Sequence, residues 1–439
     1  MNGSWHPLLD EERATKALMI AKEIAEAISR GEGTAPGGFS PRQIEIWRNV
    51  LGTGHAGFSL LHTYLFCCGA GAAHADLAIE HLDQACDFMA SVRMSESLYY
   101  GFPGISWVTA HLSGRLFEAE PDDGVELDES LCSFLSHPSH PGEYDLINGY
   151  VGLGVYALER LPHPSAARCL EMVVARLAER AIESPEGASF FTPADEMLPL
   201  YRSTYPQGAF NLGVAHGLPG VVALLGAACH AGIAAPAARS LLKATVSWLL
   251  ARERPPESYF RFPHFYAPGV EPPPGRLAWC YGDLGIAVAL LMAARGAGEP
   301  SWEREGLRIA RDAACRDPGR SRIEDAGVCH GAAGAAHLFN RLYQATGDEE
   351  LAEAARHWLH KTLALRRPGR GVAGFSSLGR NDGSGSRWSA DPGLLAGATG
   401  IALTLLAASS PVSPEWDRVL LASLAPATVA PQVPRALAC

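Results

Sequence analysis

The sequence lacks the features that mark secreted, membrane-spanning and nucleic-acid-binding proteins. Its first residues contain no basic segment followed by an apolar core, so a secretory signal is not expected. No uninterrupted apolar run reaches the roughly eighteen residues that a membrane-spanning helix needs. The 36 basic residues are outnumbered by 47 acidic ones, and this net charge of -11 argues against a basic nucleic-acid surface. We therefore expect a protein that does not bind nucleic acid and is not an integral membrane protein.

Cysteine is also sparse, and its spacing is irregular. Ten cysteines in 439 residues are too few for a disulfide scaffold, and no two of them form a Cys-x-x-Cys pair. This usage fits the reducing cytoplasm. With 47% hydrophobic and 19% charged residues, the chain can bury a large core. Its length is compatible with two or three ordinary domains or with one unit built from repeats.

Glycine, in contrast, is abundant and recurs in register. The sequence Gly-x-x-Gly, followed by an apolar segment, occurs seven times at intervals of 47 to 68 residues. One such match carries no information, but seven with similar flanks indicate an internal repeat. The first glycines of the seven matches are Gly54, Gly101, Gly149, Gly217, Gly282, Gly331 and Gly397.

Two kinds of helix are predicted in each repeat. The segment after each glycine pair is apolar almost all round, as in residues 286–291, and a helix of this kind is buried on every side. The segments between them have one apolar stripe, as shown by Leu18, Ala21 and Ala25. We expect the amphipathic helices at residues 12–30, 77–93, 127–136, 165–182, 236–253, 303–316 and 348–364, and a short cap at 415–424.

This arrangement predicts an all-α fold, an α/α toroid with seven inner and seven outer helices. Residues 1–439 then form one domain, because no gap between repeats leaves room for a separate inserted domain. Three longer loops without a helical pattern, residues 184–211, 255–278 and 366–393, are expected at the rim of the central cavity. The glycines let the loops at one end of the barrel approach closely, so the residues just before them should line this cavity.

Polar and reactive side chains are concentrated at these pre-glycine positions. Two of them, Cys280 and Cys329, each stand two residues before the first glycine of a pair, and His330 follows Cys329 directly. Two thiolates and an imidazole suit zinc, and three protein ligands leave one position open. The alternative is that both cysteines are buried and inert. The full set of polar residues before or directly after the first glycines is His55, Tyr99, Tyr100, Asp145, His216, Arg276, Cys280, Tyr281, Asp283, Cys329, His330 and Asp391.

A metal with two thiolate ligands would hold a further thiol as thiolate, and this favours addition of sulfur to an electron-poor carbon. Activation of water for hydrolysis is possible with the same ligands. Sulfur addition produces an enolate, for which Arg276 and His216 have the right chemistry, with Asp145 to orient an imidazole. Each also has a structural alternative: a rim salt bridge for Arg276, a core histidine for His216 and a helix N-cap for Asp145.

The sequence resembles the lanthionine synthetase C-like family over essentially its whole length. The resemblance is carried by Trp-Cys-Tyr-Gly at residues 279–282, Cys-His-Gly at 329–331, Ala-His-Gly at 215–217 and the seven Gly-x-x-Gly turns. It implies an α/α toroid that forms lanthionine and methyllanthionine rings by adding peptide cysteines to dehydroalanine or dehydrobutyrine. The implied partners are a dehydrated precursor peptide with leader and core, a separate dehydratase and an exporter. The implied location is the cytoplasm, in association with a membrane-bound biosynthetic complex.

The resemblance also implies roles for individual residues. Zinc would be bound by Cys280, Cys329 and His330, and the acid–base residues would be His216, Asp145 and Arg276, with Tyr281 in the pocket. Arg276 is matched because it stands four residues before Cys280, and Asp145 because it stands four before Gly149.

Two other functions are compatible with the same fold. A relative that binds glutathione or another thiol, or serves as a scaffold, would keep the zinc site without cyclase activity. An α/α-toroid glycosidase would need a pair of catalytic carboxylates, for which Asp145 and Asp391 are available, but the thiolate site would then have no purpose.

Overall fold

The seven Gly-x-x-Gly sequences each begin a helix of an inner layer. The computed structural model describes residues 4–35, 37–118, 120, 123–137, 143–379 and 388–425. Within these residues, each of the seven first glycines immediately precedes a helix that is buried almost all round, as predicted. The inner helices are α3 (His55–Cys67), α5 (Phe102–Leu112), α7 (Tyr150–Glu159), α10 (Leu218–Ala231), α12 (Asp283–Ala297), α14 (Ala332–Thr346) and α16 (Ala398–Ser409).

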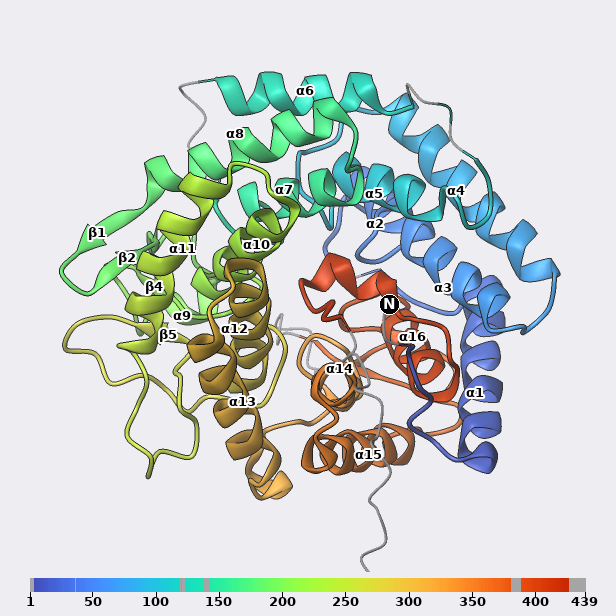
Figure 1. Cartoon of the computed structure of the whole chain (residues 1–439). Helices are drawn as coiled ribbons and strands as arrows, with labels where there is room; N and C mark the ends of the chain where they lie inside the picture. The colour runs from blue at the N-terminus through green and yellow to red at the C-terminus, as the bar shows by residue number, and fades with distance from the viewer. Residues whose placement is uncertain are drawn as a thin grey trace, which may run out of the picture.

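Amphipathic helices surround this layer and complete an α/α toroid (Figure 1). Seven of them lie within four residues of the predicted bounds at each end, and their apolar stripes face the inner layer. This confirms the predicted fold class. The outer helices are α1 (Glu11–Ser29), α4 (Ala73–Ser91), α6 (Val125–Ser136), α8 (Pro164–Arg180), α11 (Ala235–Leu250), α13 (Pro300–Ala314) and α15 (Glu349–Ala364).

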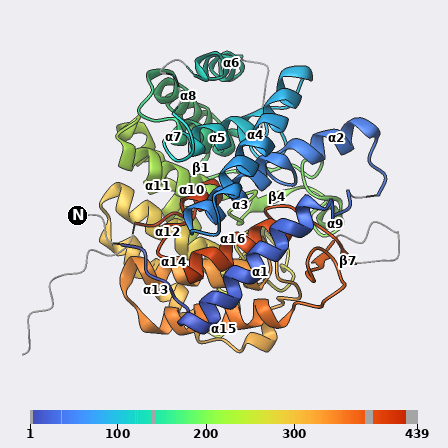
Figure 2. The same ribbon diagram turned by 90° about the vertical axis from the view of Figure 1, so that its right-hand side faces the viewer.

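The ring is closed by its first and last helices. Most inner helices pack against the outer helix that follows them in the chain, as α3 packs on α4 and α14 on α15. The last inner helix, α16, instead packs against α1, the first outer helix, and Figure 2 shows α1 running across it. The segment before α1 is fixed to the same helix, because Trp5 Nε1 donates to the carbonyl of Ala407 at 2.8 Å. One outer helix departs from the pattern: α6 packs mainly on α8 and lies at the periphery (Figure 1).

The second glycine of each pair is required by a close backbone approach. In all seven repeats, a Cβ on this glycine would lie within 2.6 Å of the carbonyl oxygen of the residue three positions before the first glycine. In the fifth repeat the glycine is Gly285 and the carbonyl belongs to Trp279. The loop therefore crosses directly over the first turn of the inner helix, where no side chain fits. Gly282 in addition has a φ of 112°, which glycine adopts without strain.

Hydrogen bonds join each pre-glycine loop to its neighbour around the ring. Six of the seven junctions between repeats are backbone contacts, and the junction of the second and third repeats uses the Ser97 hydroxyl, which donates to the Ile147 carbonyl at 2.8 Å. These loops therefore meet at one end of the barrel. The backbone junctions are Gly52 N–Tyr99 O (2.9 Å), Leu146 N–Ala215 O (3.2 Å), the Gly213–Tyr281 bridge, Cys280 N–Cys329 O (3.2 Å), Cys329 N–Leu395 O (2.7 Å) and Leu394 N–Gly52 O (2.9 Å).

The long loops contain more structure than the sequence suggested. In the first two, strands β3 (Phe191–Thr192), β4 (Ala209–Asn211) and β5 (Phe265–Tyr266) form an antiparallel sheet, with Phe210 opposite Tyr266. Residues 380–387 of the third loop, expected at the rim, lie outside the described residues. The remaining short elements are α2 (Pro41–Asn49), β1 (Ile182–Ser184), β2 (Gly187–Ser189), α9 (Pro199–Arg202), η1 (Pro318–Arg320), β6 (Ser377–Leu378) and β7 (Trp388–Ser389).

The predicted cap near the end of the chain lies at the centre of the ring (Figure 1). It forms a short 3-10 helix, η2 (Glu415–Leu420), whose Asp417 is buried. Asp417 accepts hydrogen bonds from Arg341 at 2.8 Å and from His337 at 2.7 Å, both on α14. Trp279 Nε1 donates to the Leu420 carbonyl at 2.8 Å, so this central segment also supports the loop that carries Cys280. None of the helices in the described residues is long and apolar enough to cross a membrane.

Candidate active site

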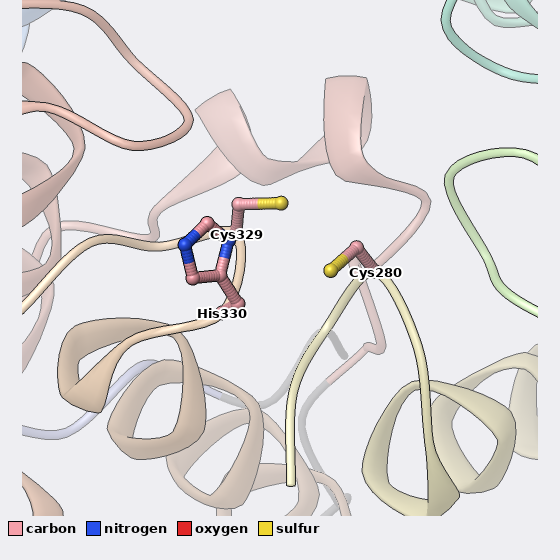
Figure 3. Close-up of side chains that lie close together, drawn as sticks. All are labelled: Cys280, Cys329 and His330. Carbon is pink, nitrogen blue, oxygen red and sulfur yellow. The ribbon is translucent and has the colours of Figure 1, made fainter. Parts of the chain in front are cut away.

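Two neighbouring loops bring Cys280, Cys329 and His330 together. Cys280 lies in the loop before α12, and the other two lie in the loop before α14, joined to it by the hydrogen bond from Cys280 N to Cys329 O. The sulfur atoms and a ring nitrogen of His330 lie within 4.8 Å of one another. Figure 3 shows the two sulfurs directed toward the same space, with the imidazole beside them. Among the described residues, no other group of three or more His, Cys, Asp or Glu side chains has ligand atoms this close.

The chemistry of these three groups fits a zinc ion. The Cys280 side chain is buried, and its hydrogen bond with Cys329, supported by His330, lowers its pKa well below the usual value for a thiol. The same hydrogen bond, together with burial, raises the pKa of Cys329 well above that value. Two thiols at this distance lose both protons readily only when a cation lies between them. Sulfur and imidazole ligands are those that zinc prefers.

His216 and Asp145 form a hydrogen-bonded pair beside this group. His216 Nδ1 bonds to Asp145 Oδ2, while Asp145 Oδ1 accepts from the backbone N–H of Asn148 at 2.7 Å. Burial lowers the pKa of His216, but the hydrogen bond to Asp145 and its charge, together with the charge of Cys280, raise it overall. The residue that caps α7 is Gly149, so Asp145 is not an N-cap. It orients the imidazole.

Arg276 and Tyr281 occupy different environments in the same loop. The Arg276 side chain is half-buried, and its charge contributes to lowering the pKa of Cys280. It forms no ion pair within the described part of the chain, so the rim salt bridge is not observed. The Tyr281 side chain is buried, and its hydroxyl accepts a hydrogen bond from Asn211 Nδ2 at 3.2 Å. Its ring also packs on His264, with 4.8 Å between the ring centroids.

Three of the polar residues that were expected to line one cavity have structural partners instead. His55 pairs with His81 on α4, with 2.8 Å between their Nδ1 atoms. Tyr99 donates to the Val419 carbonyl in the central segment at 2.7 Å. The Asp283 carboxylate binds Arg316 and accepts hydrogen bonds from the backbone N–H groups of residues 261 and 262. It therefore anchors the preceding loop to the start of α12. These side chains hold the scaffold together.

Asp391 also has a structural role. Its Oδ1 accepts from Gly393 N at 2.7 Å in a tight turn, while Asp145 is engaged with His216. Each of the two carboxylates considered for a glycosidase therefore has a partner of its own. The geometry gives no support to a carboxylate pair.

One residue beside the site was not identified from the sequence. Asp325 is buried, and its Oδ2 lies 3.6 Å from Nε2 of His330. It stands six residues before Gly331, the position that Arg276 occupies before Gly282 and Asp391 before Gly397. A comparison of equivalent positions across the repeats, beyond the residues nearest each glycine, would have found it.

Comparison with known proteins agrees with this architecture. Residues 45–421 match the family model described as lanthionine synthetase C-like protein. The nisin biosynthesis protein NisC of Lactococcus lactis subsp. lactis is 26% identical over 284 residues, which cover 57% of this chain. The matched region spans 63% of the length of that relative. The structure of nisin cyclase superimposes with a TM-score of 0.70 at 18% identity, covering 92% of this chain and 96% of that one, and so shows the same fold. The family model spans most of the chain, and the protein therefore belongs to the lanthionine synthetase C-like family.

Proposed function

We propose that the protein is a zinc-dependent lanthipeptide cyclase. It would add the cysteine thiols of a dehydrated peptide to dehydroalanine or dehydrobutyrine in the same peptide, forming lanthionine and methyllanthionine rings. The observation that carries the proposal is the position of the Cys280, Cys329 and His330 group next to the His216–Asp145 pair. The family membership and the similarity to a protein named nisin cyclase support it.

In this proposal Cys280, Cys329 and His330 hold the zinc ion. Three protein ligands are typical of catalytic zinc sites, which keep a position for a further ligand. A bound zinc ion lowers the pKa of a coordinated thiol and so keeps it as the nucleophilic thiolate at neutral pH. The proposal depends on this donor set, because two sulfurs and an imidazole suit zinc better than they suit hard cations.

His216 would move the proton during the addition. The sulfur forms a bond to the β-carbon, the carbon–carbon double bond is lost, and the thiol proton must reach the α-carbon. Because Asp145 accepts the hydrogen at Nδ1, the Nε2 atom is left to exchange a proton with the substrate. The hydrogen bond and charge of Asp145 raise the pKa of His216, which favours the protonated imidazole and suits a group that delivers a proton to the α-carbon.

Arg276 would stabilise the negative charge that develops on the carbonyl oxygen. Addition of sulfur at the β-carbon leaves an enolate until the α-carbon is protonated. An arginine without an ion-pair partner in the described residues, whose charge already acts on Cys280, suits this task. Tyr281 would contribute indirectly, by holding the loop of Cys280 in place.

The proposed reaction sets the identity of the partners. The substrate is a precursor peptide, with leader and core, whose serine and threonine residues have already lost water. A separate dehydratase must supply it, and an exporter would remove the product. We place the reaction in the cytoplasm, in association with a membrane-bound biosynthetic complex.

The test is a thiol count on the dehydrated peptide. The zinc-loaded protein is incubated with a dehydrated precursor, and free cysteines are alkylated and counted by mass spectrometry at successive times. We expect the thiols to disappear at a rate proportional to enzyme concentration, with no change in peptide mass. Thiols that disappear no faster than in buffer would contradict the proposal. Tight binding of glutathione by a protein that leaves the peptide unchanged would instead indicate a thiol-binding relative.

A further inference from the structure

A buried carboxylate faces the side of His330 that is turned away from the two cysteines. Asp325 is 2% exposed, and its Oδ2 lies 3.6 Å from His330 Nε2. Among the described residues, the His330 imidazole is the basic group that lies within ion-pair distance of this carboxylate. Asp325 Oδ1 accepts from Gly327 N at 3.2 Å, and Oδ2 accepts from Leu378 N at 2.9 Å.

The orientation of His330 assigns its two nitrogens. Figure 3 shows one ring nitrogen on the side of the sulfurs and the other directed away from them. Since Nε2 is the atom near Asp325, Nδ1 is the atom on the side of Cys280 and Cys329. The histidine thus has a carboxylate on one side and two thiols on the other.

We propose that Asp325 is a positioning residue for the metal ligand His330. Its carboxylate favours the tautomer with hydrogen on Nε2, so that the lone pair of Nδ1 is available to the metal. It also limits rotation of the ring and makes the imidazole more basic as a ligand. This inference rests on the proposed function, because it requires a metal at the site.

The other repeats show that the turn alone does not require a carboxylate. The position six residues before the first glycine is Asn211 in the fourth repeat, and its Oδ1 accepts from Gly213 N at 3.0 Å, the same turn that Asp325 makes with Gly327. Asp391 makes the turn in the seventh repeat. A buried ionised carboxylate is unfavourable unless it is paired. Of Asp325 and Asp391, only Asp325 has an ion-pair partner among the described residues, and this partner is the imidazole of His330.

Asp325 also joins the metal ligand to the third rim loop. Leu378, whose N–H it binds, lies in β6 of the loop that covers residues 366–393. One carboxylate therefore contacts the ring of His330 and binds the backbone of this loop at β6. Any displacement of β6 would act on the ligand directly.

The test compares Asp325→Asn with Asp391→Asn as a matched control. Asparagine keeps the turn, as Asn211 does, but removes the negative charge. Asp391 makes the same turn in the seventh repeat and forms no ion pair with His330, so it serves as the control. Zinc affinity is measured by competition with a chromophoric chelator, and the melting temperature of the metal-free protein reports the structural cost. We expect about 10- to 100-fold weaker zinc binding in D325N. We expect zinc affinity close to wild type in D391N.

Several results would overturn the inference. A D325N protein that binds zinc as tightly as wild type would do so, as would an equal loss of affinity in D391N. A crystal structure of the zinc-loaded wild type with Nε2 as the ligand would also overturn it, and this measurement does not depend on the folding of any variant. If the wild type itself bound no zinc, the proposed function would fail together with this inference.

Discussion

His216 and Asp145 are hydrogen-bonded across the junction between the third and fourth repeats, and the imidazole stays partly exposed while the carboxylate is buried. The bond runs from His216 Nδ1 to Asp145 Oδ2. Because a carboxylate only accepts, the hydrogen at this contact belongs to the imidazole. The pair therefore has the geometry of a general acid–base group with an orienting partner.

Replacement of His216 should separate chemistry from metal binding. We expect His216→Ala to keep its zinc and to lose cyclase activity by about 100-fold or more, because the proton-transfer group is absent. The measurements are the rate of thiol loss in the peptide and the zinc content of the same sample. Wild-type turnover in this variant would remove His216 from the mechanism.

Replacement of Cys280 should remove the metal. Two remaining ligands rarely hold zinc tightly, so Cys280→Ala should lose stoichiometric zinc when dialysed against a weak chelator. Elemental analysis of the dialysed protein gives the result. Cys315→Ala is the matched control, because Cys315 is an exposed free thiol that does not belong to the group. Full zinc occupancy in the Cys280 variant would refute the ligand assignment.

A cluster of histidines between α3 and α4 should make the fold sensitive to acid. His62 and His74 lie with their Nδ1 atoms 3.0 Å apart, and His55 and His81 lie 2.8 Å apart. Burial lowers the pKa of His62 to about 3 and that of His81 to about 4. The unfolded chain takes up protons at these residues below about pH 6.5, while the folded chain resists them. The charged groups that act on the ends of the cluster are Glu80, Arg48, Lys22 and Glu26.

The direction of the pH effect follows from these shifts. A group whose folded pKa is lowered stabilises the fold above its unfolded pKa, and that contribution is lost as pH falls from about 6.5 toward 3. We expect the free energy of unfolding to fall by on the order of 3 kcal/mol between pH 7 and pH 4 on account of His62. His62→Leu should flatten this part of the curve in urea titrations at several pH values. An unchanged slope would contradict the prediction.

The central segment should be a major determinant of stability. Asp417 is fully buried, and Arg341 and His337 outweigh the effect of burial and lower its pKa. Asp417→Ala leaves the buried Arg341 guanidinium without its counter-ion, and breaking such a pair costs about 3–5 kcal/mol. Thermal unfolding gives the measurement. Glu45→Ala removes an exposed ion pair with Arg48 and should change the stability by less than about 1 kcal/mol. Similar effects of the two substitutions would contradict this account.

The sequence predicted the layers of the fold because the Gly-x-x-Gly sequence records a packing contact. Gly285 is required where the carbonyl of Trp279 crosses the helix, and the same contact recurs in every repeat. The apolar and amphipathic patterns then distinguish inner from outer helices. They do not reveal which helices pack together, so the contact of α1 with α16 and the peripheral place of α6 emerged only from the structure. Trp416 and its neighbours are another example. Their apolar side chains predict that they are buried, but the sequence does not indicate that they lie at the centre of the ring.

For the candidate site, the sequence predicted the residues next to the glycines but not the residues that contact them. Cys280, Cys329 and His330 stand next to the glycines, so the repeat brings them to one end of the barrel. Partners outside these positions were not predicted. Asp325 acts through a side chain that turns back toward His330, and Asn211 reaches Tyr281 across a junction. Both contacts depend on how the loops fold over one another, which no spacing encodes.

The joining of α1 to α16 has a consequence for how the protein is made. In a nascent chain α1 is made well before its main packing partner α16, so much of its apolar face stays uncovered until α16 has been synthesised. Contacts this distant in sequence also slow folding. The loop of Cys329 depends on the same late event, because it donates to Leu395 just ahead of α16. We therefore expect a nascent chain to acquire its metal only after the circle has closed.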